Sequence, residues 1–563
     1  MRLEFTKAMY RPGETVNCRV SDMRTGGAVS WMLYHLDRET LQGETQDTAE
    51  GIVFTLPDRD KTGYLLVVRT TDRQGRTAEV CCAGIDCSSS WTAFPRYGYV
   101  WDYTETAEPG PVVTMLCKYR LNSLQFYDWQ YRHHLPLSPD PDSWTDWSGR
   151  KISGSVIRHY IRAAHETGMA CMAYNMIYAA NKTYLQDGSG VSPEWRLIKE
   201  NGDDFTCDMD ETLGDVGILQ YFNPLNPDWQ RYIFRREAEA LHAFDFDGWH
   251  GDTIGELGPM TTADGGPLGY REDGSPVNRV KDCYTPFLNA AKEAISPRFL
   301  TFNPVGAQGI EAVNVSRADA LYAEFWPWDR DDRGEPYDDY FSIHRAILRC
   351  AGQSGGKSLI VAGYINYKNP TPFFNEPAVR LMDSVVYASG GSRIELGNGD
   401  GMLSNEYFPD DRHKRMTPAL RAAVQRMYDF ITAYQNLLRG GLLPLPCGVQ
   451  IDAVPLSDDG KGGTVWHFSK SDGEMTAIHF INLTGTDSEW RDVNQTKKVP
   501  RALKDLKTRV FTEKPVHSLF IASPDTDDLT LRPLEFTAGQ DTEGRFISFV
   551  MPELIYWNMI LMR

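Results

Sequence analysis

The sequence predicts a multidomain protein in which a central (β/α)8 barrel carries a β-domain at each end. The chain has 563 residues, which exceeds what one hydrophobic core usually organises. Its middle part alternates apolar strand-like runs with amphipathic helical stretches, as is typical of βα units around a parallel sheet. Its two ends instead carry short β-runs separated by turns, as is typical of antiparallel sheets.

Residues 1–88 are expected to form a small β-sandwich, because short strand-like runs follow one another with turns between them. Residues 72–75 form the expected turn between the last two runs. The five runs cover residues 15–20, 28–36, 52–56, 63–71 and 77–82.

Residues 89–438 are expected to form the barrel, because eight apolar runs of strand length alternate with helical stretches. One helical stretch covers 152–167. Another covers 227–243 and begins with Asn226 as N-cap and Pro227 in the first turn. The eight runs cover residues 97–101, 123–127, 170–176, 248–252, 299–303, 320–325, 358–363 and 392–396.

Residues 439–563 are expected to form an antiparallel β-domain. A helical segment over 418–438 precedes them, and alternation with a period of two then returns. The alternating runs cover residues 449–455, 463–469, 476–483, 529–536 and 545–550.

Charge and composition favour a neutral ligand. Asp and Glu outnumber Lys and Arg by 76 to 58, and a net charge of −18 repels nucleic-acid phosphates and anionic membrane surfaces. We therefore expect neither nucleic acid nor a membrane as partner. Aromatic residues make up 12% of the chain, with 14 Trp and 27 Tyr, and such flat rings stack on sugars as well as fill cores.

Ten scattered cysteines show no zinc-ligand spacing and are expected to be free thiols, which favours a reducing cytoplasm. The N-terminus has no long apolar segment, so the chain as it stands is expected to be cytoplasmic, or extracellular if a leader was removed. The His133-His134 pair lacks a matching ligand motif, and neither a phosphate loop nor a serine elbow is present. We expect no metal and no cofactor.

Polar and aromatic residues stand at the ends of the predicted strands, where (β/α)8 barrels carry their reactive groups. These residues therefore converge on one mouth. They are Asp128, Tyr174, Asn175, Trp249, His250, Asp252, Asn303, Glu324, Trp326, Tyr364 and Glu395.

Two carboxylates on one rim are the minimum apparatus for glycoside hydrolysis, and Asp252 and Glu324 fit best. The short Asp is suited to attack the anomeric carbon. The longer Glu can reach the glycosidic oxygen, and Trp326 beside it can raise its pKa by desolvation. Other interpretations remain open: a lone Asp after a strand is often a helix cap, Glu256 is a rival carboxylate, and the rim aromatics are partly core candidates.

Several separated stretches resemble glycoside hydrolase family 66, the endo-dextranases and cycloisomaltooligosaccharide glucanotransferases. The resemblance covers about residues 1–560. The stretches are Phe94-Pro-Arg-Tyr-Gly98, Gln125-Phe-Tyr-Asp-Trp129, Ala173-Tyr-Asn175, Asp247-Gly-Trp-His-Gly-Asp252, Phe302-Asn303, Ala323-Glu-Phe-Trp-Pro327 and Glu395-Leu-Gly-Asn-Gly-Asp400.

The resemblance implies that Asp252 is the nucleophile and Glu324 the general acid/base of a retaining enzyme. It implies endo-hydrolysis of α-1,6-glucosidic linkages in dextran or isomaltooligosaccharides, through a covalent glucosyl-enzyme. It also implies an immunoglobulin-like N-domain and a Greek-key C-domain. The residues that it implies as lining of the sugar site are Asp128, Tyr174, Asn175, His250, Asn303, Glu395 and Asp400.

Two alternatives stay open. A cycloisomaltooligosaccharide glucanotransferase would pass the glucosyl group to a sugar hydroxyl instead of water. The cyclising members carry a carbohydrate-binding module near the seventh βα loop, and residues 363–377 leave little room for one, so hydrolysis is favoured. A catalytically inert carbohydrate-binding protein would bind glucan without turnover. The oligomeric state is left open.

Overall fold

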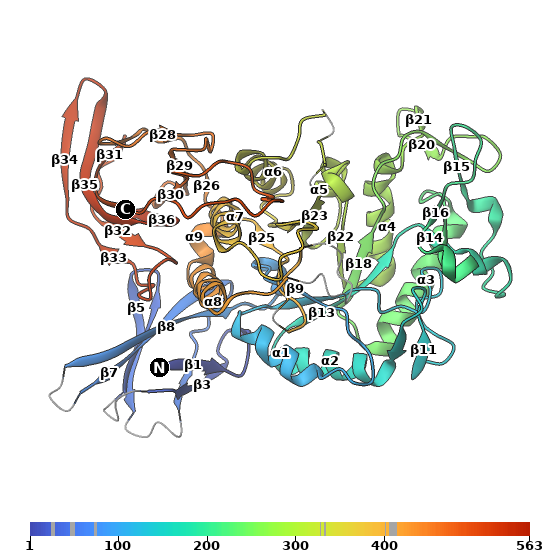
Figure 1. Ribbon diagram of the computed structural model, residues 1–563, viewed down its shortest axis with the longest axis horizontal. Coiled ribbons are helices and arrows are strands. Elements are labelled where there is room, and N and C mark those ends of the chain that lie inside the picture. Colours follow the sequence, from blue (N-terminus) through green and yellow to red (C-terminus); the bar gives the residue numbers. More distant parts are fainter. Residues whose placement is uncertain are drawn as a thin grey trace.

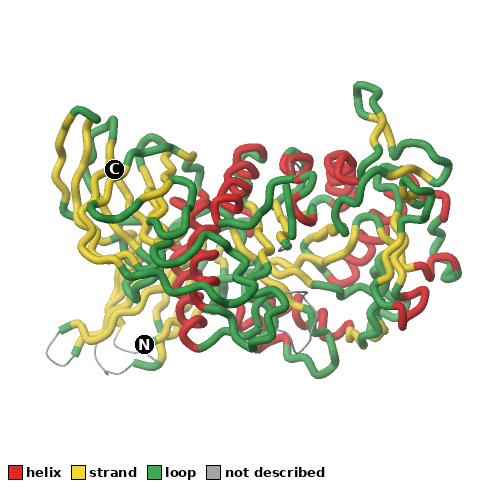
Figure 2. Tube along the Cα trace, turned by 45° about the horizontal axis from the view of Figure 1, so that its top comes forward, coloured by secondary structure: helices red, strands yellow, loops and turns green. Residues whose placement is uncertain are grey.

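The computed structural model describes residues 1–563 except 24–28, 46–50, 73–75, 327, 332–333, 400 and 405–413. Figures 1 and 2 show the strands of the two chain ends gathered on one side of the molecule, with helices α3 (Pro227–Phe244) and α4 (Tyr284–Ile295) on the other. Within the described part, no helix is long and apolar enough to cross a membrane. All ten cysteines are free thiols, as predicted.

The N-terminal residues form a five-stranded and a three-stranded sheet, ordered β2-β8-β7-β4-β5 and β1-β3-β6, with buried apolar residues of both in one cluster. The five predicted runs are observed within a few residues, apart from residue 28 and part of the turn at 72–75, which lie outside the described residues. The strands are β1 (Arg2–Phe5), β2 (Met9–Tyr10), β3 (Thr15–Ser21), β4 (Val29–His35), β5 (Arg38–Thr45), β6 (Ile52–Thr55), β7 (Thr62–Thr71) and β8 (Thr77–Cys87).

The eight predicted strands of the central part are all present, most within a residue of the expected bounds. A helix follows each of them. The strands are β9 (Tyr97–Val100), β10 (Ser123–Phe126), β13 (Ala170–Met176), β18 (Gly248–Asp252), β22 (Phe299–Phe302), β23 (Leu321–Phe325), β24 (Leu359–Gly363) and β25 (Ser392–Arg393). The remaining helices are α1 (Pro109–Lys118), α2 (Gly154–Glu166), α5 (Ile310–Asn314), α6 (Tyr340–Gln353), α7 (Glu376–Ser389), α8 (Pro418–Ala433) and α9 (Gln435–Arg439).

These strands pair in parallel as two sheets, ordered β22-β18-β13-β10-β9 and β23-β24-β25. Backbone hydrogen bonds link the sheets at both edges: Tyr99 N donates to Leu396 O at 3.1 Å, and Asp319 N donates to Leu300 O at 2.7 Å. Side chains from β9, β13, β23 and β24 share one buried cluster. Because all pairings are parallel, the carboxyl ends of neighbouring strands meet at one rim.

Short additional strands lie within the loops after β10, β13 and β18. Among them, β15 pairs with β19, and β20 forms a hairpin with β21 at the right-hand end of Figure 1. They are β11 (Ser143–Thr145), β12 (Lys151–Ser153), β14 (Ala179–Asn181), β15 (Leu197–Lys199), β16 (Thr206–Asp208), β17 (Ile218–Tyr221), β19 (Met260–Thr262), β20 (Gly269–Tyr270) and β21 (Pro276–Val277).

The C-terminal residues form a seven-stranded and a four-stranded sheet over a common core. The predicted run 529–536 is mostly wrong, since only two of its first seven residues form a strand and Pro533 lacks an N–H donor. The strands are β26 (Leu443–Pro444), β27 (Val449–Ile451), β28 (Leu456–Ser457), β29 (Val465–Ser471), β30 (Thr476–Asn482), β31 (Leu503–Phe511), β32 (Leu519–Ala522), β33 (Arg532–Pro533), β34 (Phe536–Asp541), β35 (Gly544–Leu554) and β36 (Trp557–Met562).

Helix α3 carries a fully buried carboxyl group against β13. As predicted, the helix begins at the Asn226 cap, whose side chain accepts from two backbone N–H groups. About three turns on, Glu237 accepts a hydrogen bond from Asn175 Nδ2 at 2.5 Å. Burial raises the pKa of Glu237 to about 8, so the folded protein keeps this group protonated at neutral pH.

We predict that Glu237→Gln weakens the pH dependence of stability. Above the ordinary Glu pKa the unfolded chain has lost this proton and the fold has not, so stability falls as pH rises from about 4.5 towards 8. A neutral Gln removes up to about 1.4 kcal/mol of that loss per pH unit. Urea unfolding at pH 5 and pH 7.5 measures this change in the free energy of unfolding. Glu239→Gln changes an exposed site on the same helix and should leave the pH dependence of the unfolding free energy unchanged. If Glu237→Gln showed the same pH dependence as the unmodified protein, Glu237 would not be protonated in the folded state.

Candidate functional site

The carboxylate of Asp252 ends strand β18 and is held by three donors. Tyr174 on the neighbouring strand β13 donates its hydroxyl to Oδ2 at 2.8 Å. The backbone N–H of Thr253 and the side-chain amide of Asn303 donate to Oδ1 at 2.8 and 2.9 Å. Three donors favour the ionised form of this carboxyl group and fix its orientation on a rigid strand.

The carboxylate of Glu324 lies on strand β23 and is 8% exposed. Its Oε1 accepts a short hydrogen bond from the hydroxyl of Tyr364, which directly follows β24. Its Oε2 accepts from Asn303 Nδ2 at 3.0 Å. Glu324 thus stands on the second parallel sheet, while Asp252 stands on the first.

Asn303, the residue after β22, joins the two carboxylates with one amide nitrogen. Nδ2 lies 2.9 Å from Asp252 Oδ1 and 3.0 Å from Glu324 Oε2. Those two oxygens are therefore at most about 6 Å apart, which suits the roughly 5 to 5.5 Å of a retaining pair and falls below the range of inverting pairs.

Burial and mutual repulsion oppose the ionisation of both Asp252 and Glu324 at once. Burial raises the pKa of Asp252 well above its ordinary range, and the neighbouring charge of Glu324 raises it further. Two carboxylates so close together, one buried and one half-buried, are not both ionised near neutral pH, so the pair retains one proton. One acid and one base then coexist in the same site.

An aromatic stack extends from Glu324 towards solvent. The ring of Trp326 stacks on Tyr364 with centroids 4.2 Å apart and on Trp328 with centroids 5.3 Å apart. Trp326 is half-buried and Trp328 is 63% exposed. Asp329 Oδ2 accepts from the backbone N–H of Trp326 at 2.6 Å and fixes the turn that presents both indoles.

His250 lies in the interior beneath the pair. Its Nδ1 bonds Thr301 Oγ1 at 2.7 Å, and its ring contacts Tyr174 and Tyr322. Burial lowers the pKa of His250 to about 3, so the ring is neutral. It supports Tyr174 from below.

Asp128 is buried and interacts electrostatically with Tyr174. The ring of Tyr127, the residue before it, packs on Tyr174 with centroids 4.6 Å apart. Burial raises the pKa of Asp128 to about 7, against the opposing effect of the Arg150 guanidinium. Asp400, also predicted to line the site, lies outside the described residues.

Three predicted lining residues point away from the carboxylates. Successive side chains of a strand face opposite sides, so Tyr174 and His250 face inward while Asn175 and Trp249 face the helices. Asn175 bonds Glu237 of α3, and Trp249 is fully buried against Phe287 of α4.

Glu395 is the third predicted lining residue that points away from the carboxylates. It is fully buried, receives Arg393 Nη1 at 2.8 Å and Tyr428 Oη at 3.1 Å, and so belongs to an internal ion-pair cluster with Asp383. The rival carboxylate Glu256 is likewise engaged, by Arg279 at 2.9 Å.

The sequence analysis did not single out Asp329. It is a partly buried turn residue, and burial raises its pKa to about 7. The role of Tyr364 as a direct donor to Glu324 depends on the adjacency of β23 and β24, which strand-end position alone predicts only coarsely.

One trio of metal-type side chains lies close together among the described residues: His165, Cys171 and Asp247. It stands at the start of β13 and β18, at the opposite ends of these strands from Asp252. Asp247 Oδ2 already accepts from His165 at 2.8 Å and from the backbone N–H of Cys171 at 2.7 Å. The trio is therefore accounted for as a hydrogen-bonded connection between α2, β13 and β18.

The chain is similar to two kinds of curated protein. A cycloisomaltooligosaccharide glucanotransferase from Niallia circulans is 28% identical, over 99% of this chain and 71% of that protein. A dextranase from Streptococcus salivarius is 27% identical, over 90% of this chain and 68% of that protein.

Among solved structures, a Paenibacillus sp. cycloisomaltooligosaccharide glucanotransferase complexed with cycloisomaltoheptaose superposes with a TM-score of 0.88 at 25% identity. The superposition covers 100% of this chain and 99% of that one. The family model of Glycosyl hydrolase family 66 matches residues 5–561. The match spans nearly the whole chain, so this protein belongs to glycosyl hydrolase family 66.

Proposed function

We propose that this protein is a retaining endo-hydrolase of α-1,6-glucosidic linkages in dextran or isomaltooligosaccharides. Asp252 acts as nucleophile and Glu324 as general acid/base. The observation that carries this proposal is the shared amide of Asn303, which limits the separation of the two carboxylates to about 6 Å.

In the first step Asp252 attacks the anomeric carbon and the bond to the leaving oxygen breaks, while Glu324 gives its proton to that oxygen. A covalent glucosyl-enzyme results. In the second step Glu324 takes a proton from water, the water oxygen attacks the same carbon, and the bond to Asp252 breaks. Two inversions leave the configuration unchanged.

The donors around Asp252 support its role in these steps. Asp252 accepts three hydrogen bonds, which stabilise its anionic form for attack. The Tyr364 hydroxyl and the Asn303 amide orient Glu324 towards the neighbouring carboxylate. The indole of Trp326 stacks on Tyr364 and keeps water from one side of it.

Hydrolysis is favoured over transfer because this chain lacks segments that the glucanotransferase has. Its alignment to the Niallia circulans glucanotransferase spans 722 positions, whereas the chain has 563 residues. The excess lies in segments of the glucanotransferase without a counterpart here. The dextranase aligns over 571 positions. Transfer to a second sugar hydroxyl is the competing proposal and uses the same two carboxylates.

We also infer that the eight parallel strands close into one (β/α)8 barrel, residues 89–438, between an immunoglobulin-like domain, 1–88, and a Greek-key domain, 439–563. The hydrogen bonds from Tyr99 to Leu396 and from Asp319 to Leu300 support closure at both edges. The buried cluster shared by both sheets supports a common interior.

We predict that the purified protein converts dextran into a spread of linear isomaltooligosaccharides and leaves starch and pullulan largely uncut. Chromatography of the products over time, with mass spectrometry, measures this. Cyclic products, or products longer than a short substrate, would identify a glucanotransferase. No cleavage of dextran or of shorter α-1,6 oligosaccharides would reject the proposed function.

We predict that Glu324→Gln lowers kcat by roughly 10² to 10⁴ and that Asp252→Ala lowers it further, with unchanged thermal midpoints. Azide should restore turnover of Asp252→Ala, because the small side chain leaves room for an anion at the anomeric carbon, and the product should have inverted configuration. Glu239→Gln, on the surface of α3, is the control with normal activity. Near-normal turnover by Asp252→Ala would refute the nucleophile assignment.

A further inference from the structure

The exposed aromatic side chains of the described residues all lie in loops that follow strands of the central part. Among the large apolar residues that are exposed in the described chain, three are aromatic: Tyr270, Trp328 and Phe373. They lie in the loops that follow β18, β23 and β24, the strands whose ends carry Asp252, Glu324 and Tyr364. A single exposed ring needs no explanation, but the occurrence of all three in loops that follow these strands does.

Tyr270 is the most exposed of the three, at 69%, yet its backbone is firmly held. It belongs to the hairpin β20–β21, whose tip is closed by the bond from Arg271 N to Ser275 O at 2.9 Å. The side chain of Arg271 reaches Asp282 at 2.8 Å and ties the hairpin to the segment before α4. The ring is therefore presented to solvent by a rigid support.

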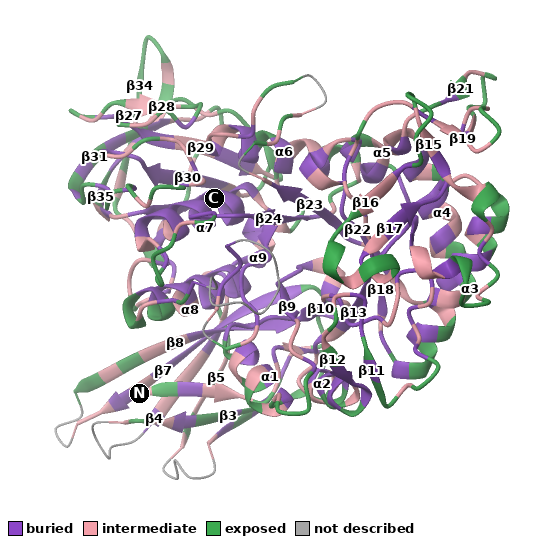
Figure 3. Ribbon diagram, turned by 45° about the vertical axis from the view of Figure 1, so that its right-hand side comes forward, coloured by how far each residue is buried: buried purple, intermediate pink, exposed green. Residues whose placement is uncertain are grey.

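A cavity of 500 Å³ lies beside this hairpin, within the size range of small-molecule sites. It is bounded on one side by β19, whose Met260 N donates to Asn278 O at 2.7 Å and so joins β19 to the hairpin. Figure 3 shows β15, β19 and β21 together at this end of the molecule. Its lining includes Glu200, Thr261, Pro267, Tyr270, Pro276 and Asn278.

The lining is more apolar than polar and is nearly uncharged. Among the described lining residues Glu200 alone carries a charge at neutral pH, while Thr261 and Asn278 offer a hydroxyl and an amide. A neutral ligand rich in hydroxyl groups matches such a surface, with one ring face available for its C–H groups.

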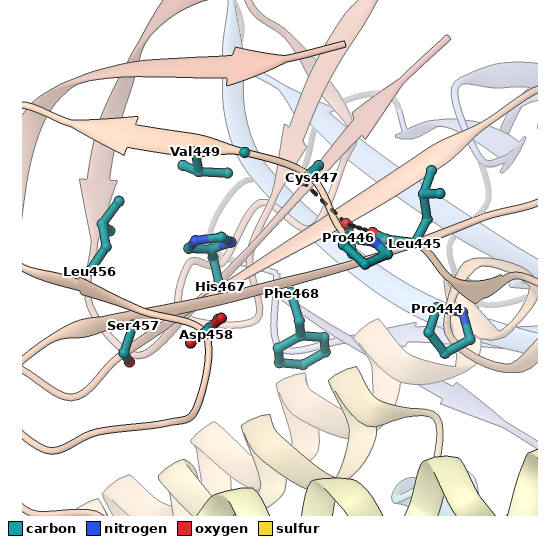
Figure 4. A pocket seen from close by; sticks show the side chains of 12 residues that line it. Pro444, Leu445, Pro446, Cys447, Val449, Leu456, Ser457, Asp458, His467 and Phe468 are labelled. Atoms are coloured by element: carbon teal, nitrogen blue, oxygen red, sulfur yellow. Dashed lines mark hydrogen bonds between the residues drawn. The ribbon is translucent and has the colours of Figure 1, made fainter. Parts of the chain in front are cut away.

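Two other cavities differ in character. One between the N-terminal sheet, α1 and α8 is lined by many charged groups, among them Arg2, Glu4, Lys118 and Arg421. The other, in the C-terminal sheets, is walled mainly by Pro444, Leu445, Pro446 and Val449, with His467 at one side (Figure 4). Neither lies in a loop that follows Asp252 or Glu324.

We propose that the cavity beside β20–β21 binds a glucose unit of an α-glucan at a distance from the cleaved bond, with Tyr270 as its stacking platform. This inference rests on the proposed function and specifies it, because such a site favours long substrates over short ones. The loop that bears Tyr270 begins directly after Asp252, so a chain held there belongs to the same rim as the catalytic pair.

The test uses two substrates and a binding assay. Tyr270→Ala should raise KM for dextran roughly 3- to 10-fold and leave kcat/KM for isomaltotriose unchanged, since a short substrate does not occupy the distant cavity. In the inactive Asp252→Ala background, Tyr270→Ala should weaken retardation in native gels that contain dextran by a similar factor. Tyr270→Phe keeps the ring and should behave as the unmodified protein.

Leu443→Ala is the matched control, because Leu443 is also 69% exposed but belongs to the C-terminal sheet. Unchanged dextran KM and retardation in Tyr270→Ala would overturn the inference, and so would equal losses on dextran and isomaltotriose. Failure of the unmodified protein to cleave either substrate would instead reject the proposed function. The gel assay would then still decide whether the cavity binds glucan.

Discussion

Two carboxylates, one buried and one half-buried, are held within about 6 Å of each other, and the arrangement of this site depends on that constraint. Like charges in a poorly hydrated place repel each other strongly. The described donors around them are neutral: the hydroxyls of Tyr174 and Tyr364, the Asn303 amide and a backbone N–H. Each donor comes from the end of a strand or the residue after it, so strand pairing sets the geometry.

A second carboxylate pair nearby shows the alternative solution. Asp383 and Glu395 are also buried, but Arg393 donates to both, at 2.6 and 2.8 Å. A guanidinium holds its protons permanently and fixes the charge of such a cluster. The hydroxyl, amide and N–H donors to Asp252 carry no charge, so they fix the charge of this carboxylate less firmly than a guanidinium would. Carboxylate pairs thus serve structure in one place and, in the proposed function, chemistry in the other.

The sequence predicted the strands and the strand-end position of the reactive groups because both follow from local periodicity. It predicted less well which way a side chain points. Asn175 and Trp249 each adjoin an inward-facing residue, and a shift of one position along a strand reverses the face. The sequence did not show that Glu395 pairs with Arg393 and accepts from Tyr428 of α8, because these contacts form only when the helices pack. Strand β31 escaped because Asp505, at φ 51°, interrupts its alternation.

The stack of Trp328, Trp326 and Tyr364 has an optical consequence. All fourteen tryptophans lie among the described residues, and Trp328 alone is exposed. Its emission is therefore the part of the intrinsic fluorescence most open to solvent, and two ring contacts connect it to Tyr364, the donor to Glu324. A sugar laid on this indole would shield it from water and shift its spectrum. The protein thus contains its own reporter of occupancy, readable in variants that no longer turn over.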